Sequence, residues 1–266
     1  MSARQIEKGE RFQALHAGQP FAIPNPWDAG TAKVLESLGF AALATTSSGF
    51  AFTLGRPDGS VSLDEVVAHT RALDLATELP LSVDLENGYG PAPEDAARAI
   101  ERVAEAGAAG GSIEDFDPEA GRLYEVGEAT ERVAAAAEAA ARLDFPFTLT
   151  ARAENHLRGN PDLDDTITRL QAYEGAGAAV LYAPALRDAA EIRAVCEATS
   201  LPVNVLGHRG LTMAEIVEAG AQRVSVGGAL AWNAIEAMAE VAEAIRDSGD
   251  LSSLAGPSRV KKWLQG

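Results

Sequence analysis

Two acidic residues lie at the end of an apolar segment, at a spacing that could bind a cation. Residues 79–86 have the sequence LPLSVDLE, and a glycine-rich stretch follows them. Such a segment, bounded by proline and glycine, predicts a buried strand. Because side chains alternate along a strand, Asp84 and Glu86 are expected on one face. Paired carboxylates repel unless a cation or a shared proton compensates, and oxygen ligands without cysteine favour Mg2+ or Mn2+. The alternative is a solvated pair of acids.

More polar residues end the other apolar segments. Glu114 ends GGSIE, and Arg152 and Glu154 end FPFTLTARAE. Alternation along the second segment adds Thr148 and Thr150 to the face of Arg152, which a purely hydrophobic core would not favour. The other polar residues at such ends are Asn25, Asp28, Thr45, Thr46, Ser47, Ser48, Asn87, Asp115, Asn155, His156 and Asn204. Several carboxylates around one arginine predict a cation site beside an anion-binding group.

These residues need a scaffold that brings the ends of strands together. Strands are predicted at 21–27, 79–86, 145–154 and 201–207, where proline lies at or near the entry, and after the helix-ending glycines 39, 107, 177 and 220. Helices are predicted at 29–38, 62–78, 94–106, 126–142, 163–175, 187–199, 212–219 and 230–247. Strict alternation of strand and helix over about 250 residues predicts an α/β fold of the (β/α)8 TIM-barrel type.

The barrel is expected to span residues 1–250, followed by a C-terminal helical tail at 251–266. A doubly wound open sheet is the rival fold, but it would usually contain fewer strands. It would also carry a glycine-rich phosphate-binding turn after the first strand, where this chain has NPWD. Active sites of TIM barrels lie at the C-terminal ends of the strands, where the polar residues of this chain are expected.

The composition and net charge of the chain restrict the kinds of partner that it can bind. The 266 residues carry a formal net charge of −17, which would repel nucleic acid and anionic membranes. Cys196 is the single cysteine, so no disulfide forms within the chain. The N-terminal stretch is too polar for a signal peptide, and no apolar run approaches the length of a membrane span. We expect a cytoplasmic protein that binds neither nucleic acid nor membranes.

The motifs NPWDAG, TTSSGFAFTLGRPDG, VDLENGYG, GSIEDF, ARAE and PVNV occur in this order between Asn25 and Gly228. Together they resemble the isocitrate lyase and phosphoenolpyruvate mutase superfamily. The resemblance implies a divalent metal, usually Mg2+, that holds a 2-oxo acid or its enolate while a C–C or C–P bond is made or broken.

The resemblance also implies roles for individual residues. In the metal site, Asp84 would touch the ion directly, Glu86 and Glu114 would act largely through metal-bound water, and Asp58 would be an outer acid. Ser48, Gly49 and Phe50 would form a turn that grips the substrate carboxylate. Arg152 would bind the carboxylate or oxo oxygen of the substrate, and Asn204 would line the pocket. Of these residues, Arg152, Asp58 and Glu114 are the expected catalytic groups.

The chain departs from the lyases in two places. Their catalytic cysteine, in a KKCGH or KRCGH loop, has no counterpart in residues 117–124, which read DPEAGRLY. The lysine or asparagine of the phosphonate enzymes is also absent between Glu114 and Glu131. A contact is also expected to be lost after Tyr182, where the chain has APA and the lyases have proline followed by glutamate. A conventional isocitrate lyase is therefore not expected.

The expected activity is that of a Mg2+-dependent lyase or decarboxylase, with Mn2+ as an alternative metal. It would act on a small 2-oxo or 2-hydroxy carboxylic acid through an enolate and release pyruvate or a similar 2-oxo acid. The alternatives are a phosphoenolpyruvate mutase or phosphonate hydrolase acting at a C–P bond, and a barrel that binds 2-oxo acids without catalysis. Family members exchange a terminal helix between subunits, so a homo-oligomer, dimer or tetramer, is expected.

Overall fold

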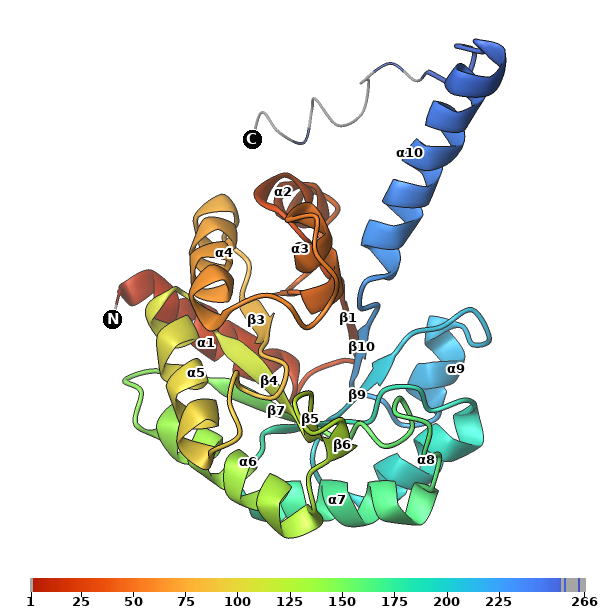
Figure 1. Ribbon diagram of the computed structural model, residues 1–266. Coiled ribbons are helices and arrows are strands. Elements are labelled where there is room, and N and C mark those ends of the chain that lie inside the picture. The colour runs from red at the N-terminus through yellow and green to blue at the C-terminus, as the bar shows by residue number, and fades with distance from the viewer. Residues whose placement is uncertain (1, 255, 257–262, 264–266) are drawn as a thin grey trace.

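Parallel strands form the centre of the molecule. The computed structural model describes residues 2–254, 256 and 263. Its eight-stranded sheet has the order β1-β10-β9-β8-β7-β4-β3-β2. The strands are β1 (Phe21–Ile23), β2 (Leu43–Ala44), β3 (Leu81–Asp84), β4 (Gly110–Glu114), β7 (Thr148–Arg152), β8 (Val180–Tyr182), β9 (Val203–Leu206) and β10 (Arg223–Ser225). Helices surround this sheet in a nearly closed barrel, which confirms the predicted (β/α)8 fold (Figure 1).

The barrel closes between β1 and β2 by a small number of bonds. These two strands stand at opposite ends of the sheet order. The backbone N–H of Ala44 donates to Pro24 O at 3.1 Å. The side chain of Asn25 donates to Thr45 O at 2.9 Å and accepts from Val226 N at 3.0 Å. Asn25, predicted only as a polar strand end, therefore joins three segments of the barrel wall.

The predicted helices are present with bounds that differ by a few residues. They are α2 (Ala29–Ser37), α4 (Leu63–Ala76), α5 (Pro93–Glu105), α6 (Val126–Ala141), α7 (Leu163–Gly175), α8 (Ala189–Ala198), α9 (Met213–Glu218) and α10 (Ala229–Ser248). Asp28, Ser62, Asp162, Asp188 and Thr212 are side-chain N-caps. Each cap satisfies backbone donors that the first turn of a helix leaves free, which fixes where the helix begins.

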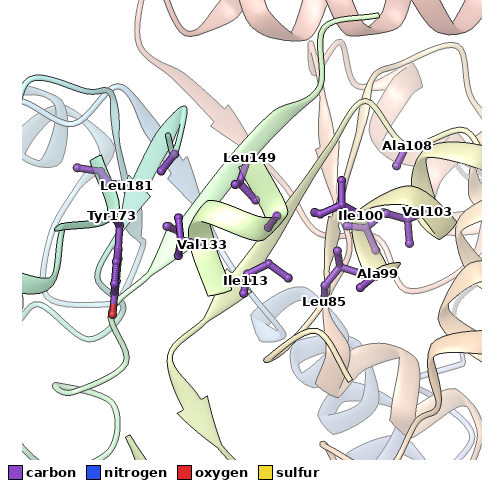
Figure 2. Close-up of a cluster of buried hydrophobic side chains, with 14 of the residues drawn as sticks. Leu85, Ala99, Ile100, Val103, Ala108, Ile113, Val133, Leu149, Tyr173 and Leu181 are labelled. Carbon is purple, nitrogen blue, oxygen red and sulfur yellow. The ribbon is translucent and has the colours of Figure 1, made fainter. Parts of the chain in front are cut away.

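The main hydrophobic core lies between the strands and the outer helices. Figure 2 shows Ile100 and Val103 of α5 facing Leu85, with Ile113 of β4 and Leu149 of β7 nearby. All five side chains are buried. Full burial of each such side chain contributes about 1.5–3 kcal/mol, so this layer holds the strand ends in place.

The helix α1 (Ala3–Leu15) was not anticipated, because its sequence is mostly polar. Its Lys8 forms an ion pair with Asp74 at 2.7 Å, and its Phe12 is fully buried against Phe21 and Ile23. A Cβ atom on Gly110, the first residue of β4, would lie 2.7 Å from the Phe12 ring. The helix therefore covers the end of the barrel at which the strands begin.

Two further elements correct the sequence analysis. The helix α3 (Ser47–Thr53) stands where a turn was expected. The hairpin of β5 (Phe116–Asp117) and β6 (Arg122–Leu123) occupies the segment that differs from the lyases. The predicted strands were also too long, because several of their last residues lie in loops. Glu86, for example, follows β3 with a φ of 48°, which breaks the strand alternation assumed for it.

The helix α10 projects away from the barrel (Figure 1). Ala231 is its buried residue, whereas Trp232 and Met238 are 48% and 62% exposed. Most of the predicted tail at 251–266 lies outside the described residues, so its helix stays a prediction. Within the part that is described, no helix has the length and apolar character that crossing a membrane requires.

Candidate active site

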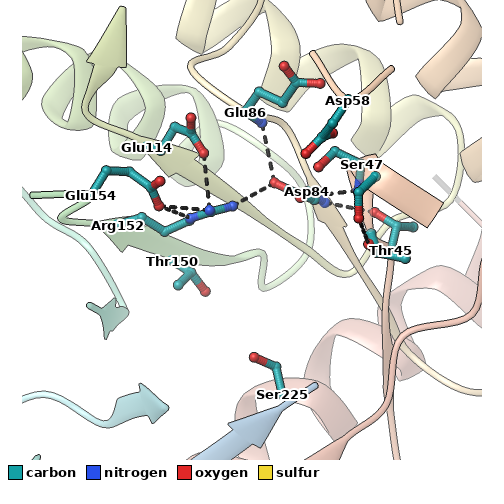
Figure 3. A network of polar contacts seen from close by, with 12 residues as sticks. Thr45, Ser47, Asp58, Asp84, Glu86, Glu114, Thr150, Arg152, Glu154 and Ser225 are labelled. Atoms are coloured by element: carbon teal, nitrogen blue, oxygen red, sulfur yellow. Dashed lines mark hydrogen bonds and ion pairs between the residues drawn. The ribbon is translucent and has the colours of Figure 1, made fainter. Parts of the chain in front are cut away.

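Arg152 lies at the centre of a group of carboxylates at the C-terminal ends of β3, β4 and β7 (Figure 3). Its Nη1 donates to Asp84 Oδ1 at 2.8 Å, and its Nη2 lies 3.1 Å from Glu114 Oε2. Its Nε and Nη2 donate to Glu154 Oε1 at 3.0 and 2.7 Å. The strand pairing of β3, β4 and β7 brings these residues together, as the sequence predicted. The arginine is already surrounded by negative charge.

Arg158 is a second cation of the site, which the sequence analysis did not single out. Its Nη2 lies 3.1 Å from Glu114 Oε1 and 3.4 Å from Glu154 Oε2. Its guanidinium carbon lies 3.7 Å from the centre of the Phe116 ring. Because Phe116 belongs to the β5–β6 hairpin, this contact links the carboxylates to the segment that differs from the lyases.

A cavity of about 350 Å³ adjoins the carboxylates. Asp58, Glu86 and Glu114 line it, and Figure 3 shows Asp58 and Glu86 on the same side of Asp84. The Oε1 atom of Glu86 is buried without a hydrogen-bond partner. Burial, followed by the charges of Asp84 and Asp58, raises the pKa of Glu86 to about 7. Within the described part of the chain Glu86 forms no ion pair, and the charges of Arg152 and Arg158 only partly offset these effects.

The pKa of Glu114 is also raised. Burial is the main cause, and the charges of Glu154 and Asp84 act in the same direction, while Arg152 and Arg158 oppose them. The acids Asp58, Asp84, Glu86, Glu114 and Glu154 outnumber the guanidinium groups of Arg152 and Arg158 around this cavity. The surplus of negative charge predicts that a cation would be stabilised here.

The donor set fits Mg2+ bound largely through water. Carboxylate oxygens are the ligands that this ion prefers, and it usually keeps several water molecules. Among the described residues, no three acidic, histidine or cysteine side chains gather closely enough to coordinate one ion together. One direct ligand, Asp84, with Glu86 and Glu114 reaching the ion through water, is the arrangement compatible with both observations. The unpartnered Oε1 of Glu86 is available for such a contact.

A second cavity of about 200 Å³ lies in the mouth of the barrel and shares Arg152 with the first. Its lining is rich in hydroxyl and amide groups, among them the predicted residues Ser48 and Asn204, and the Asp84 carboxylate also borders it. Asn204 is 1% exposed and donates to Ser225 Oγ at 3.0 Å. Figure 3 shows Thr150 and Ser225 on the opposite side of Arg152 from Glu86. The site therefore has a carboxylate-rich part and a hydroxyl-rich part.

The segment of Ser48, Gly49 and Phe50 is the first part of helix α3. The hydroxyl of Ser48 lies 3.2 Å from Thr46 Oγ1 and borders the barrel-mouth cavity. The amides of Gly49 and Phe50 donate to Oγ1 and O of Thr46, at 3.4 and 3.0 Å. The turn that was expected to bind the substrate carboxylate is thus the first turn of helix α3. The amides of Gly49 and Phe50 in this turn already have acceptors.

Phe50 does not border either cavity. Its ring stacks on His69 of α4, with the ring centres 3.8 Å apart. The neighbouring residue Ser47 lies closer to the chemistry, since its N–H donates to Asp84 Oδ2 at 3.3 Å. The structure therefore brings Ser48 to the site by its side chain, whereas Phe50 packs on His69 away from both cavities.

Asp115, which follows Glu114, faces the outer helices. Its Oδ2 accepts from Arg169 Nη1 at 3.0 Å and from the Tyr173 hydroxyl at 2.5 Å. Its Oδ1 accepts from the backbone N–H of Glu154 at 2.8 Å. Asp115 is thus a structural residue that fixes the backbone of Glu154.

Comparison with known proteins agrees with this geometry. A family model described as phosphoenolpyruvate phosphomutase matches residues 12–246. An oxaloacetate decarboxylase of Rhodopseudomonas palustris (strain BisB18) is 30% identical over 97% of this chain and 88% of its own length.

Solved structures give the same result. A protein of Burkholderia cenocepacia J2315 is 48% identical, with a TM-score of 0.95, covering 100% of this chain and 98% of its own. An oxaloacetate acetylhydrolase in complex with its product oxalate is 25% identical, with a TM-score of 0.86 and coverage of 97% and 94%. On its family match and its near-complete alignment with a relative, this chain belongs to the phosphoenolpyruvate phosphomutase family.

Proposed function

We propose that this protein is a Mg2+-dependent lyase or decarboxylase that acts on a small 2-oxo or 2-hydroxy carboxylic acid through an enolate. The observation that carries this proposal is the junction of the two cavities at Arg152. A carboxylate-rich cavity suited to a divalent cation meets a pocket lined by hydroxyl and amide groups. An acid placed across this junction would have its reacting oxygen near the cation and its remaining atoms in the neutral pocket.

Asp84, Glu86 and Glu114 would hold the ion. When bound, Mg2+ supplies Lewis-acid stabilisation of the negative oxygen that forms as the bond next to the carbonyl breaks. Mn2+ would serve in the same oxygen-ligand site. Asp58 would accept hydrogen bonds from water in the outer part of the cavity.

The other residues bind and orient. Arg152 would place its guanidinium at the same developing oxygen, and its contacts with Glu154 and Glu114 keep it in position. The Ser48 hydroxyl would orient the substrate carboxylate without adding a charge, and Asn204 would contact the rest of the acid. Leu157 borders both cavities and would keep water from their junction.

Cleavage of a C–C bond, with release of pyruvate or a similar 2-oxo acid, is supported by the similarity to an oxaloacetate decarboxylase along nearly the whole chain. Chemistry at a C–P bond is the second candidate, because the matching family model is that of the phosphomutase. Against it stands the absence of lysine and asparagine between Glu114 and Glu131. A barrel that binds 2-oxo acids without catalysis is the third reading, since no cysteine is present there either.

The test is the release of 2-oxo acids from oxaloacetate, 2-methylisocitrate, isocitrate and phosphonopyruvate, measured with Mg2+ and again with EDTA. Metal-dependent release of pyruvate or glyoxylate from oxaloacetate, 2-methylisocitrate or isocitrate would support the proposal and name the substrate. Phosphate released from phosphonopyruvate alone would favour the second candidate. Oxalate binding measured by calorimetry, without turnover of any acid, would favour the third.

A further inference from the structure

Arg223 of β10 is a buried cation in the barrel-mouth cavity that the proposed mechanism does not use. The side chain is 4% exposed and belongs to the lining of that cavity. Its Nε donates to Asn204 Oδ1 at 2.8 Å, and its Nη2 donates to Thr150 Oγ1 at 2.9 Å. Its Nη1 lies 3.1 Å from His16 Nε2. All three partners are side chains without negative charge.

His16 is held in the neutral form. Its Nδ1 lies 2.8 Å from Phe12 O, so this nitrogen carries the proton and Nε2 accepts from Arg223. Burial, followed by the charge of Arg223, lowers the pKa of His16 to about 3. The histidine therefore contributes an acceptor and no additional charge.

The two guanidinium groups that border this cavity differ in their surroundings. Arg152 contacts Asp84, Glu114 and Glu154. Among the described residues, Arg223 takes part in no ion pair, and its hydrogen bonds go to an amide, a hydroxyl and an imidazole. Burial accordingly lowers the pKa of Arg223 to about 10, with only Tyr182 opposing. A buried charge normally has a partner of opposite sign. The Asp84 carboxylate also lines this cavity, but it is paired with Arg152, so a negative group of a ligand is the partner left for Arg223.

We propose that Arg223 selects the charge of the substrate, and that its positive field makes the pocket specific for small acids with two negative groups. This inference rests on the proposed function, because it names the substrate class of the same site. Arg223 also positions two other groups of the pocket wall. It donates to the amide oxygen of Asn204, and the amide nitrogen of Asn204 donates to Ser225. Arg223 is thus a specificity-determining residue that acts by charge and position.

The experiment compares two ligands of similar size, oxalate with two negative charges and oxamate with one. Their dissociation constants are measured by calorimetry in the presence of Mg2+ for the native protein, Arg223→Met and Arg223→Lys. At an effective dielectric constant near 20, a ligand charge about 6–12 Å from the lost guanidinium accounts for about 10- to 100-fold in affinity. We expect Arg223→Met to lose that much affinity for oxalate and clearly less for oxamate, and Arg223→Lys to recover most of it.

Asn204→Asp provides a second variant in case Arg223→Met does not fold. The substitution keeps the shape of the side chain and places a carboxylate where Nε of Arg223 already donates, so the charge is neutralised inside an intact barrel. Oxalate affinity should fall as it does in Arg223→Met. Thr150→Val is the matched control, because it removes one hydrogen bond of Arg223 and leaves the charge in place, and its oxalate affinity should stay within about threefold of the native value.

Three results would overturn the inference. If Asn204→Asp or a folded Arg223→Met bound oxalate as tightly as the native protein, the charge of Arg223 would have no role in selection. Equal losses for oxalate and oxamate would show a merely structural effect, with the same conclusion. A native protein that bound no oxalate with Mg2+ present would overturn the proposed function itself, and the inference with it.

Discussion

Arg152 forms ion pairs with Asp84, Glu114 and Glu154. Its guanidinium therefore has a role besides contact with the substrate. It lowers the repulsion among acids that are needed together for a cation. The pKa of Arg152 is accordingly raised: burial alone would lower it, but Glu154, Glu114 and Asp84 together outweigh that effect. The same residue would therefore serve the metal-free protein as a counter-ion and the substrate complex as a donor.

Asp84→Asn should reduce metal-dependent turnover about 100- to 1000-fold, the usual effect of removing one electrostatic contact to a transition state. The amide keeps the size of the side chain but removes the charge that would ligate the ion. The measurement is the rate of 2-oxo acid release at saturating Mg2+. The control is Asp188→Asn, because Asp188 caps α8 by accepting from Ala190 N at 2.9 Å and asparagine caps equally well. Full activity of Asp84→Asn would remove Asp84 from the mechanism.

Glu86 should make the stability of the metal-free protein depend on pH. An unfolded glutamate has a pKa near 4.3, and burial raises the pKa of Glu86 to about 7. The folded state thus binds this proton more tightly, so stability falls as the pH rises from about 4 to 7 and the loss is complete above about 7. In urea denaturation at pH 8, the free energy of unfolding of Glu86→Gln should exceed that of the native protein by on the order of 2–3 kcal/mol. At pH 4 the two proteins should have equal free energies of unfolding.

Added Mg2+ is the matching control for that prediction. The ion binds the ionised carboxylate, so it should stabilise the native protein more at pH 8 than at pH 5, and Glu86→Gln much less at either pH. Identical pH profiles for the native protein and Glu86→Gln in EDTA would contradict the assignment.

Part of the site could be predicted residue by residue. Asp84, Glu114 and Arg152 follow from strand alternation, because their strands are regular up to those positions. Glu86 was assigned correctly to the cavity but for an incomplete reason, since its backbone has already left the strand. Arg158 lies in a loop without periodicity, and no sequence pattern indicated its position. Arg223 did leave a signal, namely a charged residue within a short apolar strand.

At the scale of elements, helices α3 and α10 meet at the pocket. A Cβ atom on Gly228, the N-cap of α10, would lie 2.5 Å from Ser48 Oγ and 2.8 Å from Trp232 Nε1. Gly228 has a φ of −72°, so the backbone itself would accept alanine. Gly228 is therefore required by the close approach of the two helices, whereas Gly227 is favoured by its positive φ of 53°.

Gly228→Ala should therefore displace the Ser48 hydroxyl and raise the KM of the acid substrate about tenfold, with a smaller change in kcat. Steady-state kinetics on the best substrate of the panel would measure this. Gly127→Ala is the control: a Cβ there would meet nothing within 4 Å, and alanine within helix α6 should stabilise the protein by about 0.5–1 kcal/mol. An unchanged KM for Gly228→Ala would show that Ser48 does not orient the substrate.

The order of the main strands and helices could be predicted because each helix end carries glycine or proline signals at the boundary with the next strand. Helix α1 could not, because most of its residues are polar and its stability comes from Phe12 and Lys8 in distant contacts. Helix α3 was not predicted, because serine and glycine in its sequence SSGFAFT favour a turn locally. Tertiary contacts decide both cases.

At the scale of the whole molecule, α10 carries apolar residues that the barrel does not cover. Trp232 and Met238 are largely exposed, and Ile245 is 38% exposed. Met238 and Ile245 are seven residues apart and so lie on one side of the helix, and exposed apolar residues on one side of a projecting helix are typical of an interface. We propose a homo-oligomer, a dimer or tetramer, that covers this helix with a second copy of the chain.

Met238→Glu should shift the oligomer toward monomers at micromolar concentration, because it places a charge on the apolar side of the helix that Met238 shares with Ile245. Light scattering coupled to size exclusion would give the mass. Glu240→Gln, on the same helix, is the control and should leave the mass unchanged. A native protein that is monomeric under these conditions would refute the proposal.

The small number of hydrogen bonds between β1 and β2 determines where the barrel can open locally. Few bonds join these strands, chiefly that of Ala44 with Pro24 and those of Asn25. Local opening begins where the fewest bonds must break, so we expect amide hydrogens beside this seam to exchange with solvent before those of the central strands. The seam leads directly into Ser47 and Ser48 at the pocket. We therefore expect a ligand that bridges the pocket to hold the seam between β1 and β2 closed. Release of the ligand and local opening of this seam should then be coupled.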